Sequence, residues 1–140
     1  MKKSLFYLLS FTWGLPMTLI GIIVGTILTI AGKKSEKWGA CRYFKVGKNW
    51  GGVELGLIFV TDETPTKHTK NHEHGHAIQN CYFGFLMPFI VCIPSAVRYW
   101  YRKYREYIGK PCTTKYDDIW FEGHASKIGT IYADKWNAEV

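Results

Sequence analysis

The feature that most constrains this chain is a long stretch without charge near its start. Residues 4–32, "SLFYLLSFTWGLPMTLIGIIVGTILTIAG", contain no charged residue, whereas a helix needs roughly 20 apolar residues to cross a bilayer. A secretory signal is the competing interpretation, because two lysines precede the stretch. The stretch is longer than an ordinary signal core of about 7–15 residues, and two more lysines follow it. The sequence therefore predicts a retained N-terminal membrane segment over residues 1–32.

The motif "WGLP" at residues 13–16 interrupts this segment. Gly14 and Pro16 predict a kink within it, because both residues disturb a continuous helix. The segment then forms either one bent apolar helix or a helical hairpin.

The basic residues gather beside the apolar segments. The formal net charge is +7, and nucleic-acid binding is the competing interpretation of such a basic chain. Basic residues next to membrane segments mark the cytoplasmic side and contact anionic headgroups. We therefore expect membrane lipids as partners, and no nucleic acid. The residues concerned are Lys33, Lys34, Lys37, Arg42, Lys45 and Lys48 after the first apolar segment, and Arg98, Arg102, Lys103, Arg105 and Lys110 after the second.

Residues 33–140 are predicted to form one further domain, associated with the membrane. The segment "GGVELGLIFV", residues 51–60, reads as a strand, and "CRYFKVG", residues 41–47, is expected to pair with it as a short β-hairpin. One helix is predicted from about residue 66 to residue 87, and a last helix over residues 119–136. The expected fold class is therefore mainly α and membrane-associated.

The second apolar segment, residues 82–97, is predicted to be re-entrant or buried rather than transmembrane. Basic residues flank it on both sides, so no inside–outside difference is apparent. Pro88 and Pro94 are expected to bend it. The helix that follows carries arginines on one face and aromatic residues on another, which suits a membrane interface.

Residues 71–80, "NHEHGHAIQN", carry an H-E-x-x-H pattern. On a helix, His72 and His76 lie one turn apart on one face, so both imidazoles can bind one Zn²⁺. Glu73 lies beside them and is expected to act as general base toward a water that zinc acidifies. Gly75 is expected to make room where the two histidines converge. The alternative is a charged, solvated first turn of a helix that enters the membrane.

A third metal ligand must come from elsewhere, because a catalytic zinc site uses three protein ligands and one open position. His74 faces another side of the helix, and His68 would crowd a tetrahedral site from the same helix. The segment "WFEGHASKIG", residues 120–129, offers Glu122 and His124. We predict Glu122, since two histidines and one glutamate are a common catalytic set. Its neighbours Trp120, Phe121, Ala125 and Ile128 are expected to pack the last helix against the histidine helix.

The pair "HEHGHAIQ" and "FEGHASKIG" resembles small gluzincin-type zinc metallopeptidases, which carry H-E-x-x-H on one helix and E-x-x-A-D-x-x-G on a later one. With "WGLP", the pattern is similar to small membrane proteins of bacteria and their phages, and distantly to CaaX prenyl endopeptidases. The resemblance implies His72, His76 and Glu122 as zinc ligands and Glu73 as base. The family's aspartate, which supports a ligand, is replaced by Ser126. Candidates for stabilising an oxyanion are His124, Tyr116 and Tyr132.

The leading hypothesis is a zinc-dependent peptidase acting on a peptide or protein substrate. Its expected location is a bacterial inner membrane, or the host cell membrane if a phage encodes it, with the site at the cytoplasmic face. The alternative is a non-catalytic membrane protein with a structural or vestigial metal site. An intramembrane protease of the site-2 type is less favoured, because it needs a distal aspartate in a later apolar span, which this chain lacks.

Overall fold

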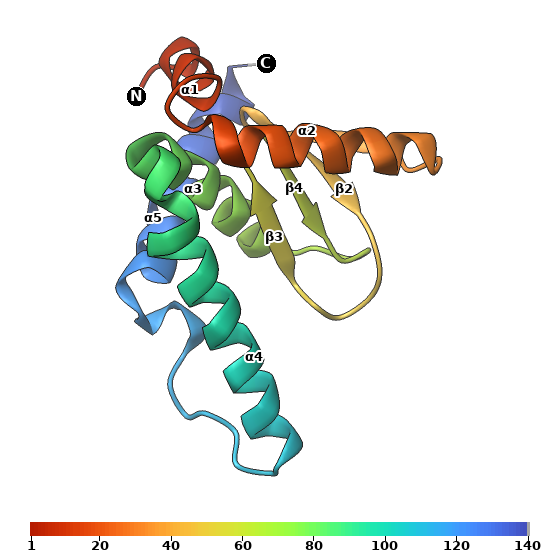
Figure 1. Ribbon diagram of the computed structural model, residues 1–140, viewed down its shortest axis with the longest axis vertical. Coiled ribbons are helices and arrows are strands. Elements are labelled where there is room, and N and C mark those ends of the chain that lie inside the picture. The colour runs from red at the N-terminus through yellow and green to blue at the C-terminus, as the bar shows by residue number, and fades with distance from the viewer. Residues whose placement is uncertain (140) are drawn as a thin grey trace.

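The computed structural model describes residues 1–139, which are mainly helical with one small four-stranded sheet (Figure 1). The helix α3 that carries the H-E-x-x-H pattern lies between this sheet and the last helix, α5. The elements are α1 (Lys3–Ser10), α2 (Leu15–Ile30), β1 (Ser35–Trp38), β2 (Cys41–Lys45), β3 (Gly52–Leu55), β4 (Ile58–Thr61), α3 (Lys67–Phe83), α4 (Ile93–Tyr107) and α5 (Trp120–Ala138).

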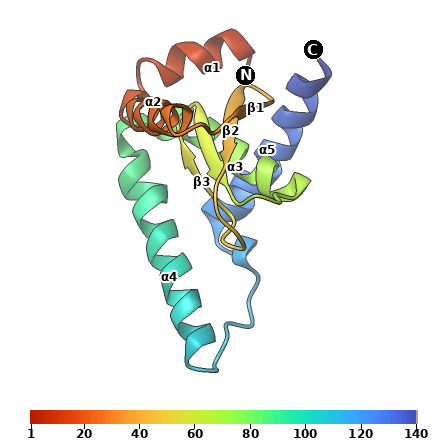
Figure 2. The ribbon, with the colours of Figure 1, turned by 90° about the vertical axis from the view of Figure 1, so that its right-hand side faces the viewer.

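The charge-free stretch forms two helices that meet at a right angle. The axes of α1 and α2 differ by 88° across the break at residues 11–14. Pro16 lies in the first turn of α2, where its missing N–H leaves no helical hydrogen bond unmade. The predicted kink at "WGLP" is therefore present, and the two helices form neither a straight rod nor a hairpin (Figure 2).

The sheet has the order β1–β2–β4–β3. The predicted pairing of residues 41–47 with 51–60 as a hairpin is wrong, because β2 pairs with β4 in parallel. The segment 51–60 is itself a hairpin, β3–β4, which turns at Gly56 with a φ of +74°. A glycine tolerates this left-handed conformation in a two-residue turn. A second hairpin joins β1 to β2, and β3 forms one edge of the sheet.

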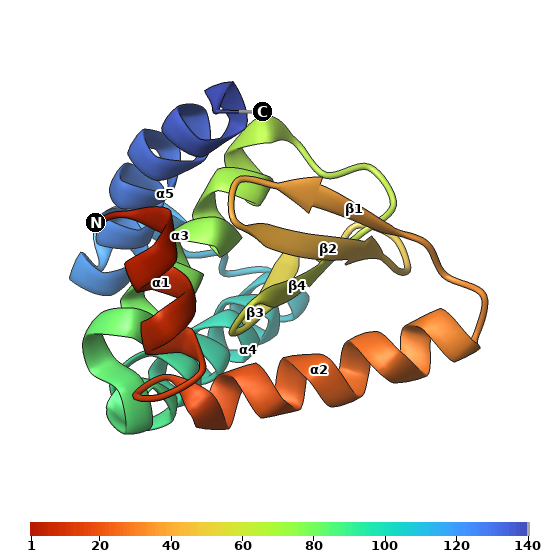
Figure 3. The ribbon, with the colours of Figure 1, turned by 90° about the horizontal axis from the view of Figure 1, so that it is seen from above.

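Both N-terminal helices pack on the rest of the chain (Figure 3). Phe6 of α1 is fully buried in a core that also contains Ile78 of α3 and Trp136 of α5. α2 lies along β3 and β4, where Gly21 approaches the backbone carbonyl of Leu55 so closely that a Cβ would not fit. A second core joins Met17, Met87, Val91 and Phe121.

The helices α3 and α5 are in close backbone contact through two glycines. A Cβ on Gly75 would lie 1.9 Å from the carbonyl oxygen of Ala125, and a Cβ on Gly129 would lie 1.8 Å from that of Asn71. Gly75 therefore makes room for α5, not for the convergence of the histidines as we expected. Phe121, Ala125 and Ile128 face the interior as predicted, whereas Trp120 is 60% exposed.

The predicted bend in the second apolar segment is present at its first proline. The helix α3 ends at Phe83, earlier than the predicted end at residue 87, and its C-cap Gly84 has a φ of +53°. The chain then turns by 115° before it continues from Pro88 to Tyr107. Pro94 does not bend the chain. It follows a π-helical turn, Pro88–Cys92, and lies in the first turn of α4, where no helical N–H is required.

Arginines of α4 hold the loop that returns to α5. Arg98 donates to the carbonyl oxygens of Lys115 (3.0 Å) and Tyr116 (2.8 Å). Arg102 donates to the carbonyl oxygen of Thr114 at 2.8 Å. These side chains fix residues 114–116 against the helix, so their role within the fold is to position the chain that leads into α5.

No one helix among residues 1–139 has both the length and the apolar character to cross a bilayer. Two bent helix pairs, α1 with α2 and α3 with α4, satisfy that test together by length and composition alone.

Candidate metal centre

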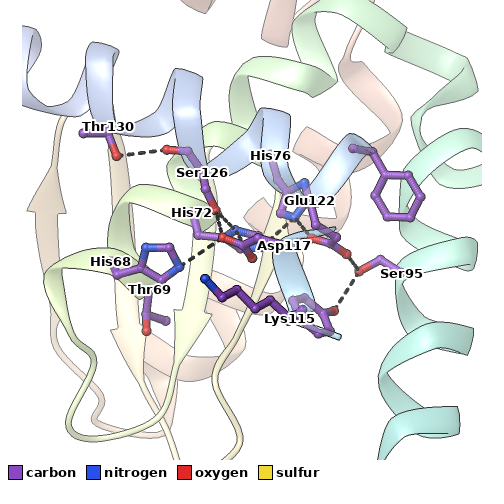
Figure 4. A network of polar contacts seen from close by, with 12 residues as sticks. His68, Thr69, His72, His76, Ser95, Lys115, Asp117, Glu122, Ser126 and Thr130 are labelled. Carbon is purple, nitrogen blue, oxygen red and sulfur yellow. Dashed lines mark hydrogen bonds and ion pairs between the residues drawn. The ribbon is translucent and has the colours of Figure 1, made fainter. Parts of the chain in front are cut away.

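Three side chains from two helices converge on one point (Figure 4). His72 and His76 lie one turn apart on α3, with their Nε2 atoms 3.1 Å apart. Glu122, in the first turn of α5, has its Oε2 atom 3.0 Å from each of these nitrogens. Glu122 is fully buried and both histidines are nearly so. The structure thus brings together all three residues that the sequence nominates as ligands.

The spacing of these three atoms fits a small tetrahedral cation. Ligands at 2.0–2.1 Å from Zn²⁺ at tetrahedral angles stand about 3.3 Å from one another. The observed separations of 3.0–3.1 Å need to widen only slightly. The donor set of two imidazoles and one carboxylate is also one that zinc accepts.

The tautomer of His76 is set by Gln79. The amide nitrogen of Gln79 donates to the carbonyl oxygen of Phe121 at 2.8 Å. Its Oε1 atom is therefore the acceptor for the Nδ1–H of His76, at 2.7 Å. A neutral His76 then presents the lone pair of Nε2 to the convergence point, which is the orientation that a metal ligand requires.

His72 is oriented by two hydrogen bonds in series, which begin at its Nδ1 atom. Its Nδ1–H donates to the hydroxyl of Ser126 at 2.8 Å, and that hydroxyl donates to Asp117 at 2.5 Å. Asp117 precedes α5 in the short turn Tyr116–Asp118. Ser126, the position at which the sequence departs from the gluzincin pattern, therefore connects His72 to a carboxylate from another segment.

Glu122 is held from a third element. The Ser95 hydroxyl of α4 donates to its Oε1 atom at 2.5 Å. Burial favours the neutral acid, but the contacts with His72 and His76 outweigh burial and hold the pKa of Glu122 well below its usual range. Burial likewise lowers the pKa of His76, yet its bond to Glu122 and the nearby Glu73 raise it to about 9. Without a metal, His76 and Glu122 therefore form a buried ion pair at neutral pH.

Glu73 lies next to the two histidines on α3 and outside the ligand triangle. It is 5% exposed, and burial raises the pKa of its carboxyl above the usual range. Gly52 of β3 packs directly on this carboxylate, since a Cβ there would lie 2.8 Å from Glu73 Oε1. A carboxylate whose pKa is shifted toward neutrality is suited to accept and return a proton.

A cavity of about 720 Å³ opens beside the centre, lined by His72, Glu73 and His76. Its other walls come from α2, the edge strand β3, the first half of α3, the π-helical turn Pro88–Cys92, α4 and the turn at Tyr116 and Asp117. A cavity of this size can hold a short peptide segment.

The other sequence candidates for the third ligand do not reach the convergence point. His74 is buried away from it, where its Nε2 accepts from the backbone N–H of Ala40 at 3.2 Å. Burial lowers the pKa of His74 to about 4, so it stays neutral. His68 is exposed and pairs with Asp117 at 3.3 Å. His124 contacts the Gln79 amide nitrogen at 3.0 Å.

Of the three candidates for stabilising an oxyanion, Tyr116 lines the cavity. Its ring centre lies 6.3 Å from that of His72, and burial raises its pKa to about 12, so its hydroxyl stays protonated. Tyr132 instead accepts a hydrogen bond from the amino group of Met1. His124 is not among the residues that line the cavity.

The supporting roles of Gln79, Ser95 and Asp117 were not predicted from the sequence. Gln79 lies three residues after His76, so the helical period offered a signal for it. Ser95 and Asp117 arrive from other segments, and no local pattern marks them.

Comparison with known proteins gave no match: no protein-family model, no curated protein and no solved structure is similar to this chain.

Proposed function

We propose that this protein is a membrane-associated, zinc-dependent peptidase. The observation that carries the proposal is the convergence of His72 Nε2, His76 Nε2 and Glu122 Oε2 within 3.0–3.1 Å of one another. A solvated first turn of a helix would not bring two imidazoles and a carboxylate together. Burying these three polar groups costs folding free energy, which favours a functional role for the cluster. The gluzincin-like pattern of the sequence points to the same three ligands.

The role of each residue follows from its surroundings. His72, His76 and Glu122 would hold the zinc, which supplies Lewis acidity and lowers the pKa of water in its open position. Glu73 takes the proton of the attacking water and later gives it to the leaving amine, since it lies beside the ligands and has a raised pKa. Among the three residues considered as oxyanion stabilisers, Tyr116 lines the cavity, and its protonated hydroxyl would donate to developing negative charge.

The membrane part of the proposal rests on exposed apolar side chains of two helices. Along Pro88–Tyr107, exposed apolar residues recur every three or four positions, which makes one continuous face. They are Phe89, Ile93, Val97, Trp100, Tyr101 and Tyr104. α2 adds a second exposed group, Leu19, Ile20, Ile22, Ile23, Ile27 and Ile30. Contiguous apolar surface on this scale suits a lipid surface.

The test separates metal binding from catalysis. Detergent-purified protein is expected to carry one zinc per chain, and His76→Ala to lose it. Glu73→Gln is expected to keep the zinc but to lose hydrolysis of a peptide library, because it removes the base and leaves the ligands. Absence of stoichiometric zinc would overturn the metal site. Stoichiometric zinc without hydrolysis in the wild type would leave a structural metal protein.

A further inference from the structure

The cavity beside the candidate metal centre has two chemically different sides. Met17, Leu55, Met87 and Val91 form an apolar side that continues into the second core. Methionines adapt their shape to an apolar guest, because the side chain is unbranched and polarizable. The polar side is formed by the histidines, Glu73, Ser95 and Tyr116. A ligand that contacts the metal-binding side chains therefore also contacts apolar side chains on its opposite side.

The edge strand β3 runs along this cavity and can pair with an extended ligand. Residues 51–55 line it continuously, and β3 is the last strand of the sheet, so within residues 1–139 one of its edges has no strand partner. Gly52 brings this strand into contact with the Glu73 carboxylate. An extended peptide that pairs with an edge strand gains main-chain hydrogen bonds. The occupant best suited to this wall is thus an extended peptide whose cleaved bond lies near Glu73.

Charge excludes one class of peptide. The described residues that line the cavity include three carboxyl groups, those of Glu54, Glu73 and Asp117, but no lysine or arginine. Glu54 is itself buried, with its Oε2 atom lacking a hydrogen-bond partner. An acidic side chain of the substrate that lies away from the metal would be buried without a lysine or arginine to pair with, and burying an unpaired charge is unfavourable.

We infer that this cavity selects peptide bonds flanked by a bulky apolar residue and rejects those flanked by an acidic one. The inference rests on the proposed peptidase function and specifies its substrate class. The apolar side receives the side chain, the edge strand aligns the backbone, and the absence of lysine and arginine from the described lining sets the discrimination against acids.

The test uses small zinc-binding probes so that binding is read without turnover. Zinc-loaded Glu73→Gln protein is titrated calorimetrically with acetohydroxamate and with two larger hydroxamates, one bearing an isobutyl and one a carboxymethyl side chain. The isobutyl probe is expected to bind about 10- to 100-fold more tightly than acetohydroxamate, because a leucine-sized group becomes buried. The carboxymethyl probe is expected to bind no better than acetohydroxamate.

A matched pair of variants links the preference to this cavity. Ala96→Trp, made in α4 on a residue that lines the cavity, should abolish the advantage of the isobutyl probe over acetohydroxamate. Val97→Trp is the control, since Val97 is the next residue, is 63% exposed and does not line the cavity. Equal binding of the isobutyl and carboxymethyl probes, or no effect of Ala96→Trp, would overturn the inference and leave the peptidase proposal standing. Failure of the wild type to bind zinc overturns both.

Discussion

His72 is joined to Asp117 through the hydroxyl of Ser126. The imidazole donates to this hydroxyl at 2.8 Å, and the hydroxyl donates to the carboxylate at 2.5 Å. The direct distance from His72 Nδ1 to the nearer oxygen of Asp117 is 3.9 Å, too long for a hydrogen bond. The serine therefore completes a link that a longer acidic side chain at the same position would make alone.

Replacing Asp117 by asparagine should weaken zinc binding. The carboxylate fixes the orientation of the Ser126 hydroxyl, and through it the tautomer of His72. Loss of such an outer partner costs about 10- to 100-fold in metal affinity. Competition with a chelator of known affinity measures the change.

A control variant and a compensating variant can both be made near Asp117. Asp118→Asn makes the same charge change on the adjacent residue, whose carboxylate accepts from the backbone N–H of Lys115, and it should leave zinc affinity unchanged. Asp117→Asn combined with Ser126→Asp should recover most of the affinity, because the new carboxylate can accept from His72 directly. Equal affinity of Asp117→Asn and wild type would show that the link does not support the site.

Zinc binding should become stronger as pH rises. In the metal-free protein the pKa of His76 is about 9, so its imidazole carries a proton at neutral pH that zinc must displace. The apparent association constant is therefore expected to rise about tenfold per pH unit between pH 7 and 8.5, and to level off above 9. Calorimetry in buffers of different ionisation enthalpy should detect release of about one proton per zinc. A pH-independent affinity over this range would contradict the protonated state of His76.

The same pair sets the pH range in which the metal-free protein is most stable. His76 has a raised pKa, so its contribution is complete below its ordinary value of 6.5 and is lost as pH rises through about 9. Glu122 has a lowered pKa, so its contribution is present above its ordinary value of 4.5 and is lost at lower pH. The melting temperature of metal-free protein should therefore be highest between pH 4.5 and 6.5.

Gly129→Ala should disrupt the contact between α3 and α5. Its Cβ would lie 1.8 Å from the carbonyl oxygen of Asn71, so the helices must separate. Overpacking of this kind costs about 1–3 kcal/mol in the free energy of unfolding. Zinc affinity should fall as well, because the separation moves Glu122 away from both histidines. Denaturation with urea and zinc titration measure the two effects.

Lys127→Ala provides the matched control for this substitution. It lies on the exposed side of the same helix and should leave both quantities unchanged within about 0.5 kcal/mol. A Gly129→Ala protein that is as stable as wild type and binds zinc equally well would show that this close approach is not required.

Local patterns in the sequence predicted what depends on local structure. The spacing of His72 and His76 predicted their common helix face, and the opening of the last helix at residue 119 or 120 predicted the carboxylate at Glu122 facing them. Gly14 and Pro16 likewise predicted the kink between the first two helices. The common face of the histidines and the kink are decided by residues within one or two helical turns, whereas Glu122 was predicted from the ligand set that zinc commonly takes.

What the sequence did not reveal depends on contacts between distant segments. The sequence of β2 suits either a local hairpin or the parallel pairing with β4 that is observed. The observed pairing goes with contacts that β4 makes to α2 and to α3, which lie far from β2 in the sequence. Asp117 reaches Ser126 because Arg98 and Arg102 hold the preceding loop against α4. Gly75 has its close neighbour in α5, which no pattern around the histidines indicates.

The exposed face of α2 should mediate attachment to lipid. Ile23 and Ile27 are each 59% exposed and one turn apart, so replacing both by lysine removes apolar surface without disturbing the side that packs on β3 and β4. Flotation with vesicles of neutral phospholipid is the sharper measurement, because added positive charge would itself favour anionic lipid. The double variant should float at most one-tenth as much as wild type, since two buried isoleucines each contribute about 1.5–3 kcal/mol.

Thr64→Lys with Ala138→Lys adds the same charge at exposed positions elsewhere and should float as wild type does. If the isoleucine variant floats equally well, α2 is not the surface that contacts the membrane.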